Sequence, residues 1–330
     1  MIYSFCTYFD SNYLYKGITM YRSLLHVSDD FKLWILCFDE LTYKLLSKMN
    51  LKNVELISLG EFEDEDLLRV KKDRSSVEYF WTCTPSLPLY ILHRYPELGM
   101  ITYIDADLYF YTDPLPIFEE FNTSSILLIE HRYAKDIENK IKNNGRYNVQ
   151  FMTFRNDRVG IKALKWWREQ CLEWCYRRAE DGKMGDQKYL DDWTTRFRNI
   201  CVLRNKGAGL APWNIIRYSV KQVGDKIFVD EDELIFYHFH FFKMYSKSLF
   251  NLSTYKLSND HKRLIYIPYI RSMRETIHYV KEFAESFNKG YSSFRFDSMK
   301  DMLWTLMSVA RGNFMRSHGL ISKINENSLN

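Results

Sequence analysis

The stretch Ile101-Thr-Tyr-Ile-Asp-Ala-Asp-Leu-Tyr-Phe-Tyr111 places two carboxylates, Asp105 and Asp107, directly after an apolar run. The β-branched and aromatic residues of Met100–Ile104 predict a buried strand. A central strand of a parallel sheet is covered on both faces, where charges are costly, so we expect the acids just beyond its carboxyl end. Open α/β sheets bind ligands at that edge. Two carboxylates there predict a hard-oxygen site for Mg²⁺ or Mn²⁺ that bridges a substrate diphosphate.

An isolated Asp-x-Asp triplet is weak evidence for a metal site. A solvated turn at the strand end, helped by Asp113-Pro114 downstream, explains the triplet alone better than a metal does. The metal interpretation therefore depends on the strand in front of the acids and on partner residues elsewhere in the chain.

Length and composition allow one large α/β domain with an appendage, or two domains. The 330 residues are 46% hydrophobic and 17% aromatic, which is enough for a sizeable core. No run of about 18 uncharged apolar residues is present, and MIYSFCTYFD lacks a basic segment, so we expect neither a transmembrane helix nor a secretory signal. A chain of this size needs no disulfide framework, so its six cysteines agree with a reducing cytoplasm.

The net charge of +4 is spread unevenly along the chain. From Lys243 to the end, 14 Lys and Arg face 7 Asp and Glu, a net charge of +7, which leaves −3 on residues 1–242. A basic tail favours an anionic partner, and a solvated helical face is the equally weighted alternative. We expect no nucleic-acid partner, because no nucleic-acid-binding module is recognised.

The first half of the chain alternates strand-like and helix-like segments. Strands are predicted at residues 2–8, 32–38, 54–59, 100–104 and 125–129. Helices are predicted at residues 13–25, 40–49 and 86–95, and a polar stretch covers residues 61–74. Repeated strand–helix–strand units predict an α/β fold with a mostly parallel sheet and flanking helices. The absence of Gly-x-Gly-x-x-Gly after the first strand and of a P-loop argues against a dinucleotide dehydrogenase and a P-loop enzyme.

The second half is less regular. Residues 148–155 and 227–239 have strand character, and residues 159–177 predict a strongly amphipathic helix. Beyond residue 242 the chain is basic and rich in aromatic residues, and it ends in a predicted helix at residues 299–311.

Three motifs, in this order, resemble those of one enzyme family. Asp105-Ala-Asp107 ends a strand, Gly185-Asp186-Gln187 opens a helix, and Tyr237-His238-Phe239-His240 ends a late strand. The order resembles that of nucleotide-diphospho-sugar glycosyltransferases of the GT-A fold, above all the glycogenin-like and bacterial lipopolysaccharide galactosyltransferase-like enzymes. The resemblance covers residues 1–245 and implies a Rossmann-like sheet, which leaves residues 246–330 as a helical C-terminal extension.

The resemblance implies a metal shell. Asp105 and Asp107 match the metal and diphosphate carboxylates of the family, and His238 matches its late histidine, with His240 in reserve. Two carboxylates and an imidazole form an incomplete shell that suits Mn²⁺ or Mg²⁺ and leaves positions for phosphate oxygens.

The same resemblance implies three catalytic candidates. Asp186 and Gln187 match the Asp-Gln pair that lines the family's reaction centre. Gln150, within Asn148-Val-Gln-Phe151, stands where the family has an Asn-Ser-Gly type of strand entrance that faces the acceptor. Gln150 departs from the glycine that the family has at this position.

Donor contacts are implied around the first strand. The resemblance puts the nucleobase and ribose against the residues Thr7, Tyr8, Asp10 and Tyr13. The family's Lys-Pro-Trp after the histidine is missing, and so is the arginine in the helix before the acid pair. The residues expected to supply phosphate charge instead are Lys71, Lys72, Arg74 and Lys243.

Each of these residues has a structural alternative. His238 and His240 alternate along a predicted strand, and either one is also explained as a buried, hydrogen-bonded histidine. Asp186 near a helix start is typical of an N-cap, a role that can coexist with a substrate contact. Trp81 and Trp213 lie in predicted loops and are candidates for stacking on a sugar or base.

The motifs together predict a cytoplasmic, metal-dependent hexosyltransferase that uses a nucleoside-diphosphate sugar, UDP-linked, and keeps the anomeric configuration. Abundant Lys, Asn, Ile and Tyr with little Gly and Pro fit an AT-rich bacterial source, which favours the glycan or lipid-linked glycan of a surface polysaccharide as acceptor. The first alternative is a nucleotidyltransferase, which usually carries a Gly-rich basic loop where this chain has Phe9-Asp-Ser-Asn12. The second is a nucleotide-sugar binding protein that has lost catalysis.

The helix at residues 299–311 carries most of its apolar side chains on one stripe. A Trp at its edge and the flanking cations Arg295, Lys300, Arg311 and Arg316 suit a helix at a membrane interface. The alternative, weighted slightly higher, is a helix docked on the catalytic domain.

Overall fold

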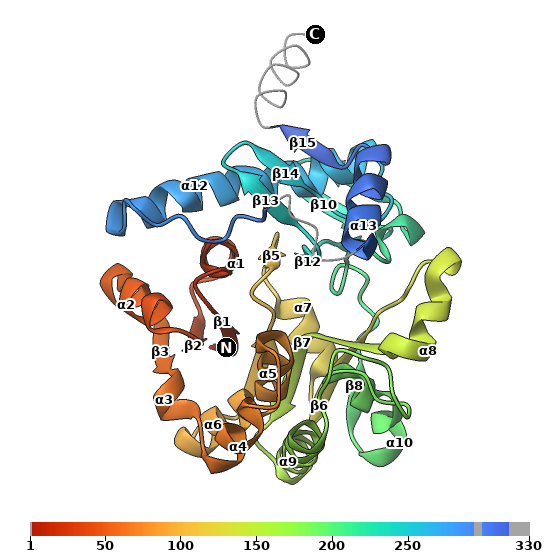
Figure 1. Cartoon of the computed structure of the whole chain (residues 1–330). Helices are drawn as coiled ribbons and strands as arrows, with labels where there is room; N and C mark the ends of the chain where they lie inside the picture. Colours follow the sequence, from red (N-terminus) through yellow and green to blue (C-terminus); the bar gives the residue numbers. More distant parts are fainter. Residues whose placement is uncertain (1, 294–298, 317–330) are drawn as a thin grey trace.

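The computed structural model describes residues 2–293 and 299–316, and its centre is a seven-stranded sheet of order β3-β2-β1-β4-β7-β6-β8 (Figure 1). The strands are β1 (Tyr3–Phe9), β2 (Phe31–Cys37), β3 (Val54–Ser58), β4 (Met100–Ile104), β6 (Ile126–Glu130), β7 (Tyr147–Arg155) and β8 (Ile200–Val202). Strands β3, β2, β1 and β4 run parallel, as do β6 and β8, whereas β7 is antiparallel to both its neighbours. The predicted mostly parallel sheet is confirmed.

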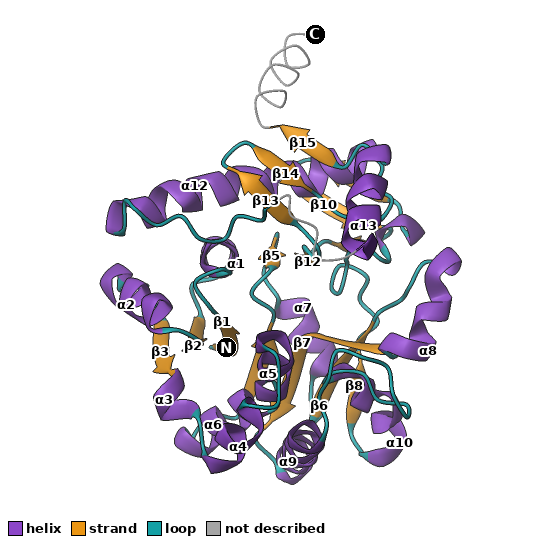
Figure 2. Cartoon of the chain, in the orientation of Figure 1, coloured by secondary structure: helices purple, strands orange, loops and turns teal. Residues whose placement is uncertain are grey.

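Helices cover both faces of this sheet (Figure 2). The longer helices are α1 (Leu14–Val27), α2 (Glu40–Met49), α4 (Glu65–Lys71), α5 (Ser76–Cys83), α6 (Ser86–Arg94), α7 (Leu115–Phe121), α9 (Arg158–Glu173), α12 (Ile267–Phe283) and α13 (Met299–Ala310). The short helical segments are α3 (Leu59–Phe62), η1 (Lys135–Lys140), α8 (Ile141–Asn144), η2 (Gln187–Asp192), α10 (Trp193–Arg196), η3 (Ile215–Arg217), α11 (Asn259–His261) and η4 (Lys262–Tyr266).

Alternation along the strands divides the apolar side chains between two cores. In β1, Phe5 and Phe9 belong to the core shared with α1 and α12, whereas Cys6 belongs to the core shared with α6 and α9. In β2, Leu33 and Trp34 divide in the same way. Successive side chains of a strand point to opposite faces, so a strand that is apolar at every position is buried on both.

Three smaller sheets surround the main one. Strand β5 (Leu108–Phe110) pairs antiparallel with β12 (Phe236–His238). The other two sheets consist of β9 (Val220–Val223), β10 (Lys226–Val229) and β11 (Asp232–Glu233), and of β13 (Lys243–Ser246), β14 (Leu249–Asn251) and β15 (Phe314–Arg316). The continuous strand predicted over residues 227–239 is wrong, because the positive φ of 55° at Asp230 turns the chain and breaks the segment into β10, β11 and β12.

The polar stretch at residues 61–74 contains helix α4, and helix α5 follows it directly. Helix α5 begins with a capping box in which Ser75 and Glu78 bond each other's backbone amides. Trp81, expected in a loop, therefore lies on a helix, and its ring packs against Gly185.

Helix α12 of the extension packs on α1 and shares its core. The hydroxyl of Thr19 on α1 donates to Tyr15 O and lies 3.0 Å from the Thr276 hydroxyl and 3.5 Å from the Met273 sulfur on α12. Met273 and Tyr269 are fully buried in the cluster that also holds Phe5. The boundary after residue 245 stays a prediction, and the residues beyond it contribute to the core of the sheet.

We expect Met273→Ala to lower the free energy of unfolding of the whole chain by about 2–5 kcal/mol, because it opens a cavity between α1 and α12. Urea denaturation of the full chain measures the change. His278→Ala, at an exposed position of the same helix, serves as the control and should stay within about 0.5 kcal/mol. Equal effects of the two substitutions would contradict a shared core.

Candidate functional site

The two acids form a turn that backbone hydrogen bonds hold from two sides. The amide of Asp105 donates to Gln150 O of β7 at 2.9 Å, and the carbonyl of Asp107 accepts from the Phe239 amide, just after β12, at 2.9 Å. Strand β5 begins at Leu108, whose register partner in β12 is His238. The turn therefore lies at the carboxyl end of β4, the edge at which the sequence predicted it.

His238 completes a cluster with the acid pair. Its Nε2 lies 3.1 Å from Asp107 Oδ1 and 3.8 Å from Asp105 Oδ2. One ligand atom from each of the three side chains lies within 4.8 Å of the other two. His240 is not a member of this cluster, although its ring centroid lies 5.5 Å from that of His238.

Gln150 orients the imidazole of His238. Its Oε1 lies 2.9 Å from His238 Nδ1, and its side chain is fully buried. With the amide oxygen facing Nδ1, that nitrogen carries a proton and donates it, which directs Nε2 toward the two carboxylates. A metal-binding histidine commonly has its second nitrogen held in this way. Gly209, beside Gln150, has a φ of 75°, and a Cβ there would lie 2.4 Å from Ile129 and 2.6 Å from the Arg132 guanidinium, so this position requires glycine.

The electrostatics of the cluster favour a positive charge among the three groups. Burial lowers the pKa of His238, but Asp107 and Asp105 outweigh it, so the net pKa is raised. Burial raises the pKa of Asp107, but His238 and then Lys16 outweigh it, so its pKa lies well below the usual range. Burial dominates at Asp105 and raises its pKa to about 6.

The donor set fits a divalent cation. Two carboxylates and one imidazole nitrogen are hard or borderline ligands, and they converge from three directions while leaving further coordination positions free. The positive charge that the cluster favours is supplied by a proton on His238 or by a divalent cation. The residues present therefore fit the Mn²⁺ or Mg²⁺ site that the sequence predicted.

Lys16, on the first turn of α1, is a site residue that the sequence reasoning missed. Its Nζ lies 3.7 Å from Asp107 Oδ2 and 4.1 Å from the ring centre of Tyr13. The side chain is largely buried, and the neighbouring Tyr13 and Asp107 raise the pKa of Lys16 against the lowering effect of burial. The spacing of Tyr13 and Lys16, three residues apart on one helical face, was the available signal.

The residues after β1 surround the same turn. Tyr8 bonds Thr84 through the two hydroxyl oxygens at 2.9 Å, and its ring packs on Tyr103, whose hydroxyl donates to Asp105 at 2.9 Å. The Asp10 carboxylate accepts from the amides of Asn12 and Tyr13, which shapes the loop into α1.

The Asp39 carboxylate has hydrogen-bond partners, whereas the Thr7 hydroxyl has none in the described part of the chain. Asp39 caps α2 by accepting from Thr42 N, and it also accepts from Ser11 N, so it fixes the loop that follows β1. Thr7 is buried, and its hydroxyl has no hydrogen-bond partner within the described part of the chain.

Asp186 and Gln187 lie at the start of η2. Asp186 occupies the N-cap position of η2, as predicted, but its carboxylate makes no side-chain cap bond there. Burial raises the pKa of Asp186 to about 7, despite a hydrogen bond from Thr84 that lowers it. Gln187 Nε2 donates to Asn144 O at 2.8 Å, and Asn148 Nδ2 lies 3.5 Å from Gln187 Oε1.

Three predicted phosphate contacts have no recorded contact with the acid pair in the described part of the chain. Lys72 is exposed at the end of α4, and Lys243 is exposed on β13. Arg74 donates to Leu172 O and lies over the Tyr176 ring at 3.9 Å. Of the cations in the described residues, Lys16 rather than these three has a recorded contact with the acid pair.

Trp213 lies beside both late histidines. Its ring centroid is 5.3 Å from those of His238 and His240, and its indole N–H donates to His131 O at 2.9 Å. His131 in turn lies 3.0 Å from Asn148 Nδ2 and is stacked on Tyr133. This aromatic layer, of which the sequence predicted only Trp213, packs against His238 and His240.

Two relatives from Bacillus subtilis (strain 168) cover most of the chain. YfnD is 32% identical over 293 residues, which are 88% of this chain and 94% of YfnD. YfnF is 36% identical over 253 residues, which are 74% of this chain and 84% of YfnF. The chain belongs to their family. Both relatives are described as uncharacterized proteins, so they assign no activity, and no protein-family model matches the chain.

A solved structure shares the fold of this chain. The galactosyltransferase LgtC, crystallised with donor and acceptor sugar analogs, matches 82% of this chain and 95% of its own length with a TM-score of 0.53 and 12% sequence identity. The fold of the chain is thus that of the GT-A glycosyltransferases, as the motif order predicted.

We expect His238→Ala to weaken Mn²⁺ binding by at least about 100-fold and Gln150→Leu by roughly 10–100-fold, because the first removes a ligand and the second its orienting partner. His240→Ala should leave the affinity within about threefold, since His240 lies outside the cluster. Calorimetric titration with Mn²⁺ measures all three variants. A larger loss for His240→Ala than for His238→Ala would move the ligand to His240.

Proposed function

We propose that this protein is a metal-dependent glycosyltransferase that moves a hexose from a nucleoside-diphosphate sugar, UDP-linked, to a growing bacterial surface glycan. The observation that carries the proposal is the cluster of Asp105, Asp107 and His238 at the carboxyl end of β4 in a GT-A fold. Open α/β sheets bind their ligands at this edge. The donor and acceptor sugar analogs bound to LgtC support the substrate class.

The chemistry assigned to the cluster is stabilisation of the leaving diphosphate. A divalent cation, when bound there, supplies positive charge to the phosphate oxygens. Gln150 keeps Nε2 of His238 directed at the carboxylates, so the ligands need little rearrangement on binding. Lys16 contributes a second positive charge beside Asp107. Lys72, Arg74 and Lys243 remain candidates for phosphate contacts in a donor-bound state.

The reaction centre is proposed to lie between the metal cluster and η2. Asp186 and Gln187 line it, with the Gln187 amide held by Asn144 O. An aspartate whose pKa is about 7 exchanges a proton near neutral pH. Thr7, Tyr8, Asp10 and Tyr13 are proposed to hold the nucleotide, and the anomeric configuration is proposed to be retained.

We expect Asp107→Ala to abolish sugar transfer while leaving the fold intact, because it removes a ligand and the partner of Lys16. Calorimetry with a UDP-sugar series should give heat with Mn²⁺ and little with EDTA. Asp10→Ala, in the loop before α1, should weaken donor binding without removing its dependence on the metal.

The products separate this proposal from its alternatives. Release of UDP from a UDP-sugar in the presence of Mn²⁺ identifies a transferase. Formation of UTP from a UDP-sugar and pyrophosphate identifies a nucleotidyltransferase. Binding of the UDP-sugar without turnover identifies a binding protein that has lost catalysis. Donor affinity that is equal with Mn²⁺ and with EDTA would reduce the acid pair to a structural turn.

The proposed acceptor is lipid-linked, which makes the exposed face of α13 relevant. The helix docks through Trp304, whose ring packs on Phe241, and through Ser308, whose hydroxyl donates to Ser253 O. Its apolar stripe faces outward, with exposed fractions of 40–76% at Met299, Met302, Leu303, Leu306, Met307 and Val309. A docked helix and an exposed stripe thus coexist, so docking and membrane contact, predicted as alternatives, do not exclude each other.

The structure describes the side chains of two of the four cations that flank the apolar stripe of α13. Arg316 is exposed on β15, and Arg311 donates to Thr254 O. Arg295 lies outside the described residues, and so does the side chain of Lys300. Within residues 2–293 and 299–316, no helix is long and apolar enough to cross a membrane. We propose a cytoplasmic enzyme, in keeping with its free cysteines, that contacts the inner membrane face through α13.

We expect the full chain to co-sediment with anionic vesicles at low salt, and the double variant Leu303→Ser, Leu306→Ser to stay in the supernatant. Each basic residue near the lipid contributes roughly 1 kcal/mol, so salt should weaken binding. The matched control is Leu68→Ser, Val223→Ser, which removes two exposed apolar side chains elsewhere. Wild-type protein that remains soluble at low salt would overturn the membrane contact.

A further inference from the structure

A small cavity lies near the metal cluster, between η1, residues 212–216, residues 254–256 and α13. Its volume is about 270 Å³, and its walls include Lys140, Trp213, Phe241, Tyr255, Lys256 and Arg311. This volume is just below the roughly 300–1,000 Å³ that ligand sites usually measure, so the cavity suits a ligand as small as a single sugar residue.

The cavity and the proposed metal site share a neighbouring residue, Trp213. Trp213 lines the cavity and also contacts the rings of His238 and His240 at 5.3 Å. Phe241, another wall residue, follows His240 in the chain, with ring centroids 4.1 Å apart. A molecule in the cavity therefore lies within one side-chain layer of the proposed metal site.

The cavity walls combine aromatic faces with an excess of positive charge. Three cations, Lys140, Lys256 and Arg311, line the cavity against one carboxylate, Asp136. Lys140 Nζ lies 2.9 Å from the Tyr255 hydroxyl and 4.6 Å from its ring centre, so the ammonium is held at the wall. Lys256 is exposed. Cations in a partly apolar pocket bind phosphate and carboxylate oxygens more strongly than they do in open water.

We propose that this cavity is the acceptor subsite and that it selects a sugar residue carrying an anionic group. The proposal rests on the proposed glycosyltransferase function. Partly exposed rings of Phe241 and Tyr255 offer the apolar faces that a sugar ring packs against, and Lys140 and Lys256 provide donors for its phosphate or carboxylate.

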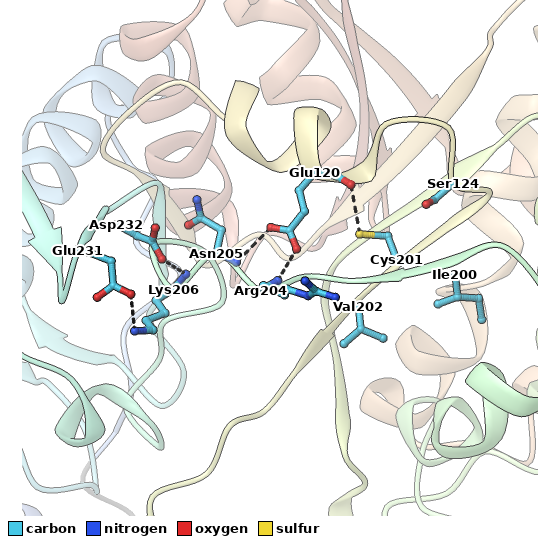
Figure 3. A pocket seen from close by; sticks show the side chains of 10 residues that line it. All are labelled: Glu120, Ser124, Ile200, Cys201, Val202, Arg204, Asn205, Lys206, Glu231 and Asp232. Atoms are coloured by element: carbon cyan, nitrogen blue, oxygen red, sulfur yellow. Dashed lines mark hydrogen bonds and ion pairs between the residues drawn. The ribbon is translucent and has the colours of Figure 1, made fainter.

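A second, larger cavity lacks these features. It measures about 740 Å³ and lies along β8 and the residues that follow it (Figure 3). Glu120 there accepts from the amides of Arg204 and Asn205, and Lys206 pairs with Glu231, so these charged groups already have partners. It carries no comparable aromatic wall and lies apart from the acid pair.

The test follows the indole N–H signals of the full chain labelled with ¹⁵N-tryptophan. Of the eight tryptophans, Trp213 and Trp304 line the cavity, and Trp213→Phe and Trp304→Phe assign their signals. The probes are glucose 6-phosphate, glucuronate and glucose, titrated with EDTA present so that no anion binds through a metal. Both anionic probes should shift these two signals, and glucose should do so at least about tenfold more weakly.

Matched lysine variants then locate the charge recognition. Lys256→Met and Lys140→Met should each weaken binding of the anionic probes by about tenfold. Because Lys256 is exposed, its substitution disturbs the fold less than that of Lys140. Lys48→Met, an exposed lysine on α2, should leave binding unchanged. If glucose shifts both signals as strongly as the anionic probes, or if neither signal moves, the proposal is wrong.

The binding test and the activity test have independent outcomes, so failure of one proposal can be told from failure of the other. Release of UDP from UDP-sugars by wild-type protein with Mn²⁺ tests the glycosyltransferase function and does not use the cavity. Indole shifts without any donor turnover would leave an anionic-sugar site on a protein that is not a transferase. Turnover without indole shifts would leave a transferase whose acceptor binds elsewhere.

Discussion

The antiparallel pairing of β5 with β12 is the constraint on which the site depends. This pairing sets His238 opposite Leu108, the residue after Asp107. It therefore brings an imidazole from a distant part of the sequence against the two acids at the end of β4. Buried carboxylates are costly without a positive partner, and a buried imidazole is poorly placed without an acceptor. The imidazole therefore offsets the cost of burying the two carboxylates, and the carboxylates give the imidazole its acceptors. Together the three groups form a site for a cation.

The antiparallel strand β7 supports this arrangement from the other side. Because it runs between β4 and β6, Gln150 meets both halves of the cluster, through its carbonyl with the Asp105 amide and through its side chain with His238. A glycine at this position, as in the family that the sequence resembles, has no side chain to orient the imidazole. In this chain the orientation of the proposed ligand comes from Gln150.

The segment after residue 245 serves the site in two ways. Helix α12 completes the core behind α1, the helix that carries Lys16 toward Asp107. Helix α13 closes one wall of the cavity beside Trp213 and presents its apolar stripe outward. The extension is therefore part of the proposed acceptor side as well as of the core, and it connects the reaction centre to a surface that suits lipid.

Local patterns were sufficient for the elements of the main sheet and for the acid pair. Apolar runs with β-branched residues predicted β1, β2, β3 and β4, and helical spacing predicted α1 and α2, because both signals act within a few residues. The same reasoning failed where turns interrupt an apolar segment, as at Asp230, and where a helix begins in a polar stretch, as α4 does.

The site divides in the same way. The sequence by itself determined that Asp105 and Asp107 end a buried strand, since alternation and the cost of buried charge act locally. Only the tertiary structure decided which late histidine faces them, that Lys16 joins them, and that Arg74 packs on Tyr176. Those choices depend on the pairing of β5 with β12 and on the packing of α1 and α5, which bring together residues that are far apart in sequence and that no local pattern links.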